Sequence, residues 1–326
     1  MKRFEPELLE RALAALEAAQ SVVVATHVDP DGDAVGSLLA LGLMLRDRGK
    51  QVTFYDRDPV PYNYRFLPGA ECLVSRLPES ADLLCLLDCS SRERAGKELA
   101  AWTGARHSLC IDHHLTSHVE AEISLVDAAA SATGELVYEL ARELDPDFGY
   151  EVAINLYTAI LTDTGSFRYS NATPAAFAAA GELVARGVDP WEVTQQVYES
   201  HPAARIRLLA RVLETLKVSP SGKAAGVWVT EAMFAETGSN SEFTDGMINY
   251  PRSIAGVEVA FMVRETGPGE CKVSFRSRGR VNVAALAAEY GGGGHHNAAG
   301  CRLNGRLEEV VEKVFALVDA SLQKLA

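Results

Sequence analysis

A segment near the N-terminus, HVDPDGD at residues 27–33, places one histidine and three carboxylates within seven positions. Leaving so many charges unpaired in a cleft costs free energy, so a bound cation is their natural partner. Carboxylates and an imidazole suit Mn²⁺, with Mg²⁺ or Co²⁺ as alternatives, and the lack of thiolates argues against structural zinc. Taken alone, the segment could instead be an Asp-rich turn that caps the next helix.

Three later segments also end in acidic residues or histidines. These are DLLCLLD ending at Asp88, SLCIDHH ending with Asp112, His113 and His114, and AILTD ending at Asp163. A parallel sheet brings the carboxyl ends of its strands to one edge, where ligands bind. Helix capping explains one such Asp easily but three independent arrivals poorly. We therefore predict one metal centre built from all four segments.

The elements that must position these residues alternate along the first half of the chain. Strands are expected at 21–27, 51–56, 82–88 and 108–112, and helices at 5–19, 37–49, 134–144 and 154–165. This alternation predicts an α/β fold with a parallel sheet.

The pattern changes after about residue 180. Helices are expected within 175–216, strands at 224–230, 257–265 and 271–278, and further helices at 281–290 and 307–325. We predict an α/β N-terminal domain over residues 1–185, a helical linker over 186–216, and a smaller α+β domain over 217–326. A chain of 326 residues fits two domains.

Composition excludes several classes of protein. The net charge of -13 argues against coating long duplex nucleic acid, which depends on many Lys and Arg contacts to phosphate. None of the six cysteines forms a C-x-x-C pair. The N-terminus reads as an amphipathic helix rather than a signal peptide, and no apolar run approaches the roughly 20 residues that span a bilayer. We expect a cytoplasmic protein without membrane contact, and a homodimer only because such assemblies are the commonest.

The motifs resemble those of a known family. THVDPDGDAVGS (26–37), LLDCSS (86–91), IDHH (111–114) and LTDTGSFRYSN (161–171) are similar, in order, to the four motifs of the DHH phosphoesterase superfamily. GGGGHHNAAG (291–300), with KVSFRSRGRVNVAALAAEY before it, resembles the DHH-associated C-terminal domain. Length and the two-domain plan most resemble the group of bifunctional oligoribonucleases (nano-RNases) and pAp phosphatases. His107 and His118 lie outside these motifs and are expected at the surface or in packing.

The resemblance implies two divalent metal ions that share one ligand. The implied ligands are His27, Asp31 and Asp88 for one ion, and Asp33, Asp88, His113 and Asp163 for the other. Two ions roughly 3.5–4 Å apart can bridge a hydroxide that attacks phosphorus in line with the leaving oxygen.

Three more residues of these motifs are expected to support the reaction. The resemblance assigns Asp29 an orienting role at the catalytic site, and His114 contact with the substrate phosphate as a hydrogen-bond donor or acid. Asp112 is expected to orient His113, as carboxylates often do for metal-bound histidines.

The glycine run at 291–294 is a second candidate site. Glycine tolerates positive φ, and successive N–H groups can bind an anion, although a flexible turn is the plainer alternative. Arginine upstream favours phosphate, because its guanidinium matches phosphate oxygens. The substrate-binding residues implied by the resemblance are Arg252, Arg276, Ser277, Gly293, Gly294, His295 and His296. For Arg252, a structural salt bridge is an equal alternative.

The function implied is hydrolysis of phosphoester bonds in short single-stranded RNA of two to a few nucleotides, giving mononucleotides. Removal of a phosphate from 3′-phosphoadenosine 5′-phosphate could accompany it. In this scheme the first domain cuts, the second binds the substrate, and helices near 186–216 act as a hinge. The alternatives are a phosphodiesterase for linear or cyclic dinucleotide signals (pApA, pGpG or cyclic di-AMP) and a non-catalytic nucleotide-binding module.

Overall fold

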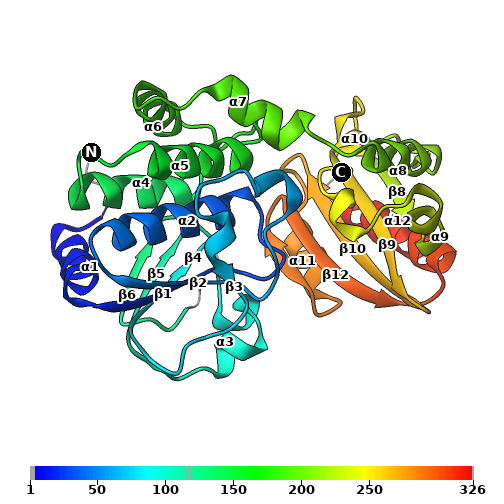
Figure 1. The fold of residues 1–326 in the computed structure, drawn as a ribbon. Coiled ribbons are helices and arrows are strands. Elements are labelled where there is room, and N and C mark those ends of the chain that lie inside the picture. The colour runs from blue at the N-terminus through cyan, green and yellow to red at the C-terminus, as the bar shows by residue number, and fades with distance from the viewer. Residues whose placement is uncertain (1–3, 115–116, 118, 325–326) are drawn as a thin grey trace. The chain divides into compact units, whose positions relative to one another are not determined.

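The computed structural model describes residues 4–114, 117 and 119–324. The chain forms two compact units, residues 1–200 and 201–326, which are described separately (Figure 1). The boundary falls within residues 186–216, and the role of that stretch as a linker stays a prediction.

The first unit is built on a six-stranded sheet in the order β3-β2-β1-β4-β5-β6, and every neighbouring pair is parallel. The predicted parallel α/β fold is therefore confirmed. The strands are β1 (Ser21–Ala25), β2 (Gln51–Tyr55), β3 (Leu73–Val74), β4 (Ala81–Leu87), β5 (Ala105–Asp112) and β6 (Ile123–Val126). The two edge strands, β3 and β6, were not predicted because each is only two to four residues long.

The strand order reverses between β1 and β4. From β1 the chain moves outward to β2 and β3, then returns to β4 on the other side of β1 and continues to β5 and β6. The connections that leave β1 and β4 therefore diverge, and in open α/β sheets ligands bind at such a switch point, outside the carboxyl ends of the strands. Both HVDPDGD and Asp88 begin at this switch point.

Helices cover both faces of this sheet (Figure 1). In β1, Val22 and Val24 join the core under the long helices, whereas Val23 and Ala25 join the smaller core on the side of α3. Burial on both faces explains why the strand is continuously apolar. The helices are α1 (Pro6–Ala18), α2 (Gly32–Asp47), α3 (Lys97–Ala101), α4 (Thr133–Leu144), α5 (Tyr150–Asp163), α6 (Pro174–Ala185) and α7 (Pro190–Thr194). Single-turn helices occupy Tyr62–Tyr64, Ala70–Cys72 and Arg92–Ala95, and a π-helical turn spans Gln195–Glu199.

Helix α2 begins five residues before the predicted start at residue 37. Asp31 is its N-cap, and Asp31 Oδ1 accepts hydrogen bonds from the N–H groups of Asp33 and Ala34, both at 3.1 Å. The cap satisfies N–H groups that lack partners within the helix. The acidic segment is thus both a helix cap and a source of carboxylates, so the two alternatives weighed for it are compatible.

The second unit holds a mixed sheet in the order β11-β12-β10-β9-β8-β7, antiparallel except for the β8–β9 pair. Its strands are β7 (Lys217–Val218), β8 (Ala224–Val229), β9 (Val259–Gly267), β10 (Glu270–Ser277), β11 (Gly293–His295) and β12 (Ala298–Asn304). Its helices are α8 (Ala203–Glu214), α9 (Glu231–Thr237), α10 (Asn249–Ser253), α11 (Val283–Ala288) and α12 (Leu307–Gln323), with a single turn at Ser241–Thr244. This mixed sheet confirms the predicted α+β character of the second half.

Alternate residues of β9 face two separate cores in the second unit. Val259 and Phe261 pack with residues of α11 and α12, and Ala260 and Met262 pack with residues of α8 and the segment before α10. The sheet is therefore covered on both faces, like that of the first unit.

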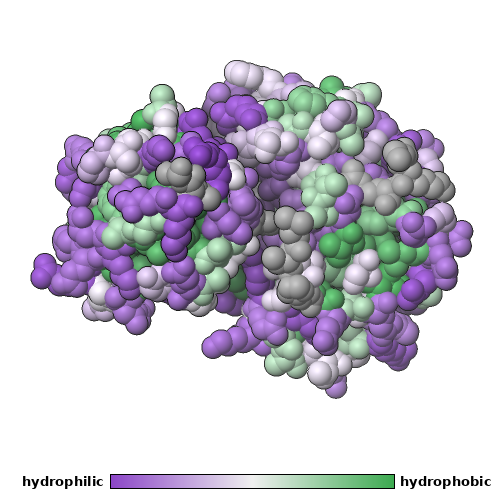
Figure 2. All heavy atoms as spheres, turned by 180° about the vertical axis from the view of Figure 1, so that it is seen from behind, coloured by the Kyte–Doolittle hydropathy of each residue, from purple (hydrophilic) through white to green (hydrophobic). Residues whose placement is uncertain are grey.

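Among the described residues, no helix is long and apolar enough to cross a bilayer. All six cysteines are free, and five of them are buried. Hydrophilic side chains cover most of the face shown in Figure 2, and apolar side chains form smaller areas on it.

The close packing of α2 on α5 can be tested at Gly36. A Cβ atom at Gly36 would lie 2.5 Å from the backbone oxygen of Asn155. We expect Gly36→Ala to lower the free energy of unfolding by about 1–3 kcal/mol, because the helices must separate. Gly181→Ala in α6 is the matched control: its Cβ meets nothing within 4 Å, so it should stabilise by about 0.5–1 kcal/mol. Chemical denaturation measures both, and equal effects would contradict this account of the packing.

Candidate metal centre

The candidate ligands come from five different elements. His27 and Asp31 lie in the connection after β1, Asp33 lies in the first turn of α2, and Asp88 follows β4 directly. Asp112 ends β5 and is followed by His113 and His114, and Asp163 is the last residue of α5. Asp163 therefore arrives from a helix end rather than from a strand.

Asp88 lies at the middle of the cluster. Its Oδ2 is 3.5 Å from His27 Nε2, and its Oδ1 is 3.6 Å from His113 Nε2 and 3.5 Å from His114 Nδ1. The carboxylate is only 3% exposed, and Thr133 Oγ1 donates a hydrogen bond to Oδ1 at 2.9 Å. Asp88 has φ of +51°, a left-handed conformation that costs energy outside glycine and that turns its side chain into the site.

Three sets of side chains each place one ligand atom per residue within 4.8 Å of one another. The sets are His27, Asp31 and Asp88; Asp33, His113 and Asp163; and Asp88, His113 and His114. The structure thus brings together all six residues that the sequence assigned to metal binding. Their role as ligands stays a prediction.

Asp33 is held by the N-terminus of α4, far along the chain. Its Oδ2 accepts the N–H of Thr133 at 2.6 Å, and its Oδ1 accepts the N–H of Gly134 at 2.8 Å and the hydroxyl of Ser37 at 3.0 Å. The helix N-terminus carries partial positive charge, so it stabilises the buried anion. These bonds fix the orientation of the carboxylate before any cation binds.

His27 and His113 both direct Nε2 toward the carboxylates, because Nδ1 of each ring lies close to a main-chain carbonyl. His27 Nδ1 lies 2.9 Å from the carbonyl oxygen of Val28, and His113 Nδ1 lies 3.3 Å from that of Ala130. A carbonyl only accepts, so Nδ1 carries a proton in both rings, and Nε2 is the nitrogen directed at the cluster, where it can bind a cation once it has lost its own proton. Convergent imidazole nitrogens and carboxylate oxygens fit a divalent cation of the Mn²⁺ type.

The prediction that Asp112 orients His113 is wrong. Asp112 Oδ1 lies 2.6 Å from His114 Nδ1 and also accepts the backbone N–H of His114 at 3.2 Å. Asp112 is fully buried at the end of β5, and the turn that follows folds His114 back over it. Asp112 therefore orients His114, while the carbonyl of Ala130 contacts His113.

Two supporting residues were missed from the sequence. Thr133 bonds Asp88 through its hydroxyl, and Asn171 Nδ2 donates to Asp163 Oδ2 at 3.2 Å and to the Ser131 carbonyl at 2.9 Å. Asn171 is the last residue of the motif LTDTGSFRYSN, so its place in that motif could have indicated a role at the site. Thr133 carried no such signal, because a Thr near a helix start usually reads as a cap.

Asp29 lies at the edge of the cluster. It is exposed, has φ of +54°, and its backbone N–H donates to Asp58 Oδ2 at 2.8 Å. Its predicted orienting role is untested. His107 is exposed near the start of β5, with Nδ1 2.7 Å from Glu122, and His118 lies outside the described residues.

In the second unit, Arg276 and Ser277 end β10. Ser277 is buried, and its hydroxyl accepts the N–H of Gly279 at 3.0 Å, which shapes the turn after the strand. Arg276 is half-buried, and its Nη1 donates to the Phe275 carbonyl at 3.1 Å. The carbonyl of Arg252 accepts a hydrogen bond from the guanidinium of Arg278 at 2.9 Å. The backbone at Arg252 is therefore bonded to the turn that follows β10.

The glycine run pairs with β12 through β11. Gly294 has φ of +142°, and a Cβ there would lie 2.4 Å from the Ala298 carbonyl oxygen, whereas Gly293 has open space. His296 Nε2 lies 2.9 Å from the Gly279 carbonyl. His295 pairs with Ala298 through the backbone, and its side chain lies outside what the structure describes. Strand pairing alone thus requires glycine at position 294.

Comparison with known proteins agrees with this geometry. Residues 21–162 match the N-terminal domain of the DHH family, and residues 225–324 match the DHHA1 domain. A Thermus thermophilus protein named "Bifunctional oligoribonuclease and PAP phosphatase NrnA" is 34% identical over 98% of this chain and 97% of its own length. This chain belongs to the DHH family. The family predicted from the motifs is therefore confirmed, and with it the prediction of a hydrolase acting on phosphoester bonds.

Other relatives span nearly the whole DHH chain. A Bacillus subtilis protein of the same name is 27% identical over 87% of this chain and 89% of its own. A solved structure described as an exopolyphosphatase-related protein from Bacteroides fragilis superposes with a TM-score of 0.91 at 29% identity, covering 100% of this chain and 99% of the other. The two-unit architecture is thus shared along its whole length.

The charges of this DHH site interact strongly. Burial raises the pKa of Asp163 to about 6 and raises that of Asp33 well above its ordinary value, with the Asp88 charge adding to the effect on Asp33. Burial opposes ionisation of Asp88 too, but the surrounding histidines outweigh it and lower the pKa of this carboxylate. Burial lowers the pKa values of His27 and His113, but nearby carboxylates prevail and raise both to about 9. The metal-free centre therefore retains protons that a divalent cation, on which the family depends, would displace.

This balance predicts that metal binding strengthens as pH rises. The pKa values of about 9 for His27 and His113 mean that both rings are protonated at neutral pH and must lose their protons to bind a cation. We expect the apparent affinity for Mn²⁺ to increase from pH 6 to pH 9, with protons released on binding. Titration calorimetry in buffers of different ionisation enthalpy measures both, and His107→Ala should behave like the unsubstituted protein. An affinity independent of pH over this range would contradict the assignment.

Proposed function

We propose that this protein hydrolyses phosphoester bonds in short single-stranded oligoribonucleotides to release mononucleotides, with two divalent metal ions. The observation that carries the proposal is the convergence of three ligand sets at the switch point of the sheet, two of which contain Asp88 and two of which contain His113. The relatives named as bifunctional oligoribonucleases and PAP phosphatases support this substrate class. Removal of a phosphate from 3′-phosphoadenosine 5′-phosphate is part of the same proposal.

We assign the ligands in two groups that share Asp88. The first ion is held by His27, Asp31 and Asp88, and the second by Asp33, Asp88, His113 and Asp163. Support comes from the two oxygens of Asp88, because Oδ2 faces His27 and Oδ1 faces His113. Bound cations supply Lewis acidity to water and to phosphate oxygens. The mixed oxygen and imidazole donors favour Mn²⁺, with Mg²⁺ and Co²⁺ as alternatives.

His114 is assigned to the substrate rather than to a metal ion. Asp112 Oδ1 lies 2.6 Å from its Nδ1 and orients the ring. Held in this way, the ring is assigned contact with a phosphate oxygen, as a hydrogen-bond donor or as an acid. Asp29 keeps its proposed orienting role at the edge of the site.

We also propose that the second unit binds a substrate phosphate. The residues assigned to this role are Arg252, Arg276, Ser277, Gly293, Gly294, His295 and His296. Arg276 at the end of β10 offers a guanidinium to an anion, and the glycine-rich β11, two strands away across β12, offers main-chain N–H groups. A location in the cytoplasm and a homodimeric state stay predictions.

The proposal is tested by assaying the purified protein with Mn²⁺ on RNA oligomers of increasing length, 3′-phosphoadenosine 5′-phosphate, and linear and cyclic dinucleotides. We expect turnover to fall as the RNA lengthens. Selective cleavage of cyclic dinucleotides would instead favour a role in dinucleotide signalling, and no cleavage of any substrate would favour a binding module.

Asp88→Asn is the key variant for this assay. The amide keeps the shape of the side chain but removes the negative charge of the carboxylate shared by both metal groups and replaces one of its two oxygens, so we expect a loss of at least about a hundredfold in kcat. The exposed Asp47→Asn in α2 is the matched control and should retain activity. Undiminished turnover by Asp88→Asn would refute the shared-ligand assignment.

Arg276→Ala tests the second unit. Loss of the guanidinium should raise KM for a dinucleotide by about ten- to a hundredfold, because a charge-assisted hydrogen bond to phosphate is lost. Binding of Mn²⁺ should not change, since Arg276 lies in the other unit from the ligands. The exposed Arg302→Ala on β12 serves as control, and an unchanged KM in Arg276→Ala would count against the assignment.

A further inference from the structure

Residues 130–134, which lead from β6 into α4, bond to carboxylates of the candidate metal centre. The N–H of Thr133 donates to Asp33 Oδ2 at 2.6 Å, and the N–H of Gly134 donates to Asp33 Oδ1 at 2.8 Å. The hydroxyl of Thr133 donates to Asp88 at 2.9 Å. The end of this segment therefore orients two of the ligands assigned to the second ion.

The start of the same segment orients the other two ligands of that ion. The Ala130 carbonyl oxygen lies 3.3 Å from His113 Nδ1. The Ser131 carbonyl accepts a hydrogen bond from Asn171 Nδ2 at 2.9 Å, and this amide also donates to Asp163 Oδ2 at 3.2 Å. All four ligands assigned to the second ion thus depend on one short segment, either directly or through Asn171.

Asp88 is shared between the two ions, and the segment bonds its oxygen on the side of the second. Thr133 Oγ1 donates to Asp88 Oδ1, which lies 3.6 Å from His113 Nε2. The other oxygen, Oδ2, lies 3.5 Å from His27 Nε2. A change in the segment would therefore affect the second group of ligands more than the first.

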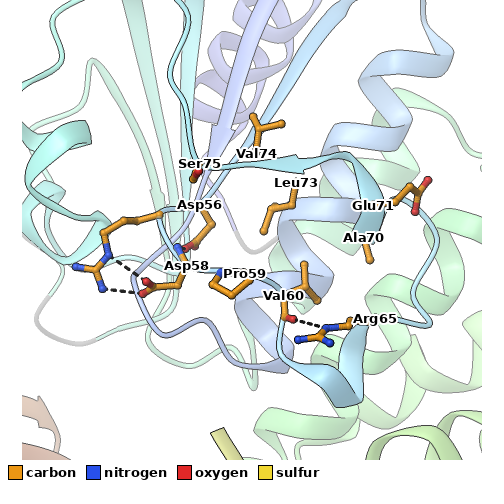
Figure 3. Close-up of a pocket in the computed structure, with 11 residues that line it drawn as sticks. Asp56, Asp58, Pro59, Val60, Arg65, Ala70, Glu71, Leu73, Val74 and Ser75 are labelled. Carbon is orange, nitrogen blue, oxygen red and sulfur yellow. Dashed lines mark hydrogen bonds and ion pairs between the residues drawn. The ribbon is translucent and has the colours of Figure 1, made fainter. Parts of the chain in front are cut away.

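The segment that carries His27 and Asp31 is held by other groups. His27 Nδ1 lies 2.9 Å from the carbonyl oxygen of the next residue, and Asp31 accepts the main-chain N–H groups of the helix that it caps. Asp58 Oδ2 accepts the N–H of Asp29 at 2.8 Å, and Arg57 bonds the Asp58 carboxylate at 3.1 and 2.7 Å (Figure 3, dashed lines). The scaffold thus orients the two groups of ligands from different places.

Glu135, in the first turn of α4, fixes the conformation of residues 130–134. It is 1% exposed, and its Oε2 accepts both the N–H and the hydroxyl of Ser131, at 2.8 and 2.6 Å. Ser131 is buried as well, so without this acceptor two buried donors would lose their partner, and the segment would have to rearrange. Among the described residues, Glu135 belongs to none of the three sets that could hold a cation.

We propose that Glu135 is a positioning residue for the second metal ion. Through Ser131 it fixes the segment that orients Asp33, Asp88, His113 and Asp163. The inference rests on the proposed function, because it uses the assignment of ligands to two ions. It adds that the two ions depend on different parts of the scaffold, so that one can be lost while the other is kept.

The test is Glu135→Met, which removes the acceptor oxygens and keeps a side chain of similar length. Titration of the metal-free protein with Mn²⁺ by calorimetry counts the bound ions, and electron paramagnetic resonance shows whether two of them are spin-coupled. We expect two coupled ions in the unsubstituted protein. In Glu135→Met, one ion should bind with unchanged affinity and the other at least about tenfold more weakly, because residues behind metal ligands contribute to metal affinity on this scale.

Glu135→Gln tests whether the acceptor or the negative charge is what matters. Its amide oxygen can still accept both bonds from Ser131, so this variant should bind the second ion nearly as well as the unsubstituted protein. A loss equal to that in Glu135→Met would show that the charge is responsible and would overturn the positioning role.

Asp82→Leu is the matched control, at the amino ends of β1 and β4. Asp82 Oδ2 accepts the N–H and the hydroxyl of Ser21, both at 3.0 Å, which repeats the pattern of Glu135 and Ser131. Loss of this acceptor should lower the melting temperature while both ions bind as before. A selective loss of one ion in this control would overturn the inference, since it would trace the effect to stability alone.

The remaining outcomes separate the inference from the function on which it rests. Unchanged affinities in Glu135→Met, or equal weakening of both ions, overturn the positioning role while two ions in the unsubstituted protein uphold the proposed centre. A single ion in the unsubstituted protein overturns both. If Glu135→Met does not fold, Ser131→Ala removes one of the two bonds with a smaller change in the core. It should weaken the second ion by about two- to tenfold, and an unchanged affinity there contradicts the inference.

Discussion

The close approach of buried anionic groups at one place is the constraint on which this structure depends. Asp88 is nearly inaccessible to water, and it shares the site with other carboxylates and with histidine rings. Charges buried in this way are stable only when protons, hydrogen-bond donors or cations compensate them. The raised pKa values of His27, His113 and Asp163 show that, without a cation, protons take part of this role.

The scaffold supplies the rest of the compensation. The N-terminus of α4 directs two main-chain N–H groups at Asp33, and the hydroxyl of Thr133 bonds Asp88. To hold these donors in place, α4 packs closely against α5. The contact leaves no room for a side chain at Gly134, since a Cβ there would lie 2.4 Å from the Cβ of Ala159. The orientation of the candidate ligands therefore depends on helix packing, since a shift of α4 would remove hydrogen-bond donors from Asp33 and Asp88 together.

The histidines of the motif IDHH divide their tasks through different hydrogen bonds. His113 is oriented by a main-chain carbonyl and turns Nε2 to the carboxylates, whereas His114 is oriented by Asp112. The carbonyl at Nδ1 directs Nε2 of His113 toward the carboxylates, whereas the Asp112 carboxylate holds His114 by its Nδ1. Two adjacent residues of one type can thus serve metal and substrate separately.

The sequence by itself determined the parallel α/β class, the family and the six candidate ligands, because apolar strands that end in Asp or His leave a local pattern. It placed the start of α2 too late, since it did not assign the cap of that helix to Asp31. Only the tertiary structure decided that Asp112 contacts His114 and that Thr133 and Asn171 support the carboxylates. Thr133 is 45 residues from Asp88 in the chain, and Asn171 is 40 residues from Ser131. Such contacts depend on how helices pack on the sheet and on where each loop turns back, which no local spacing of residue types specifies.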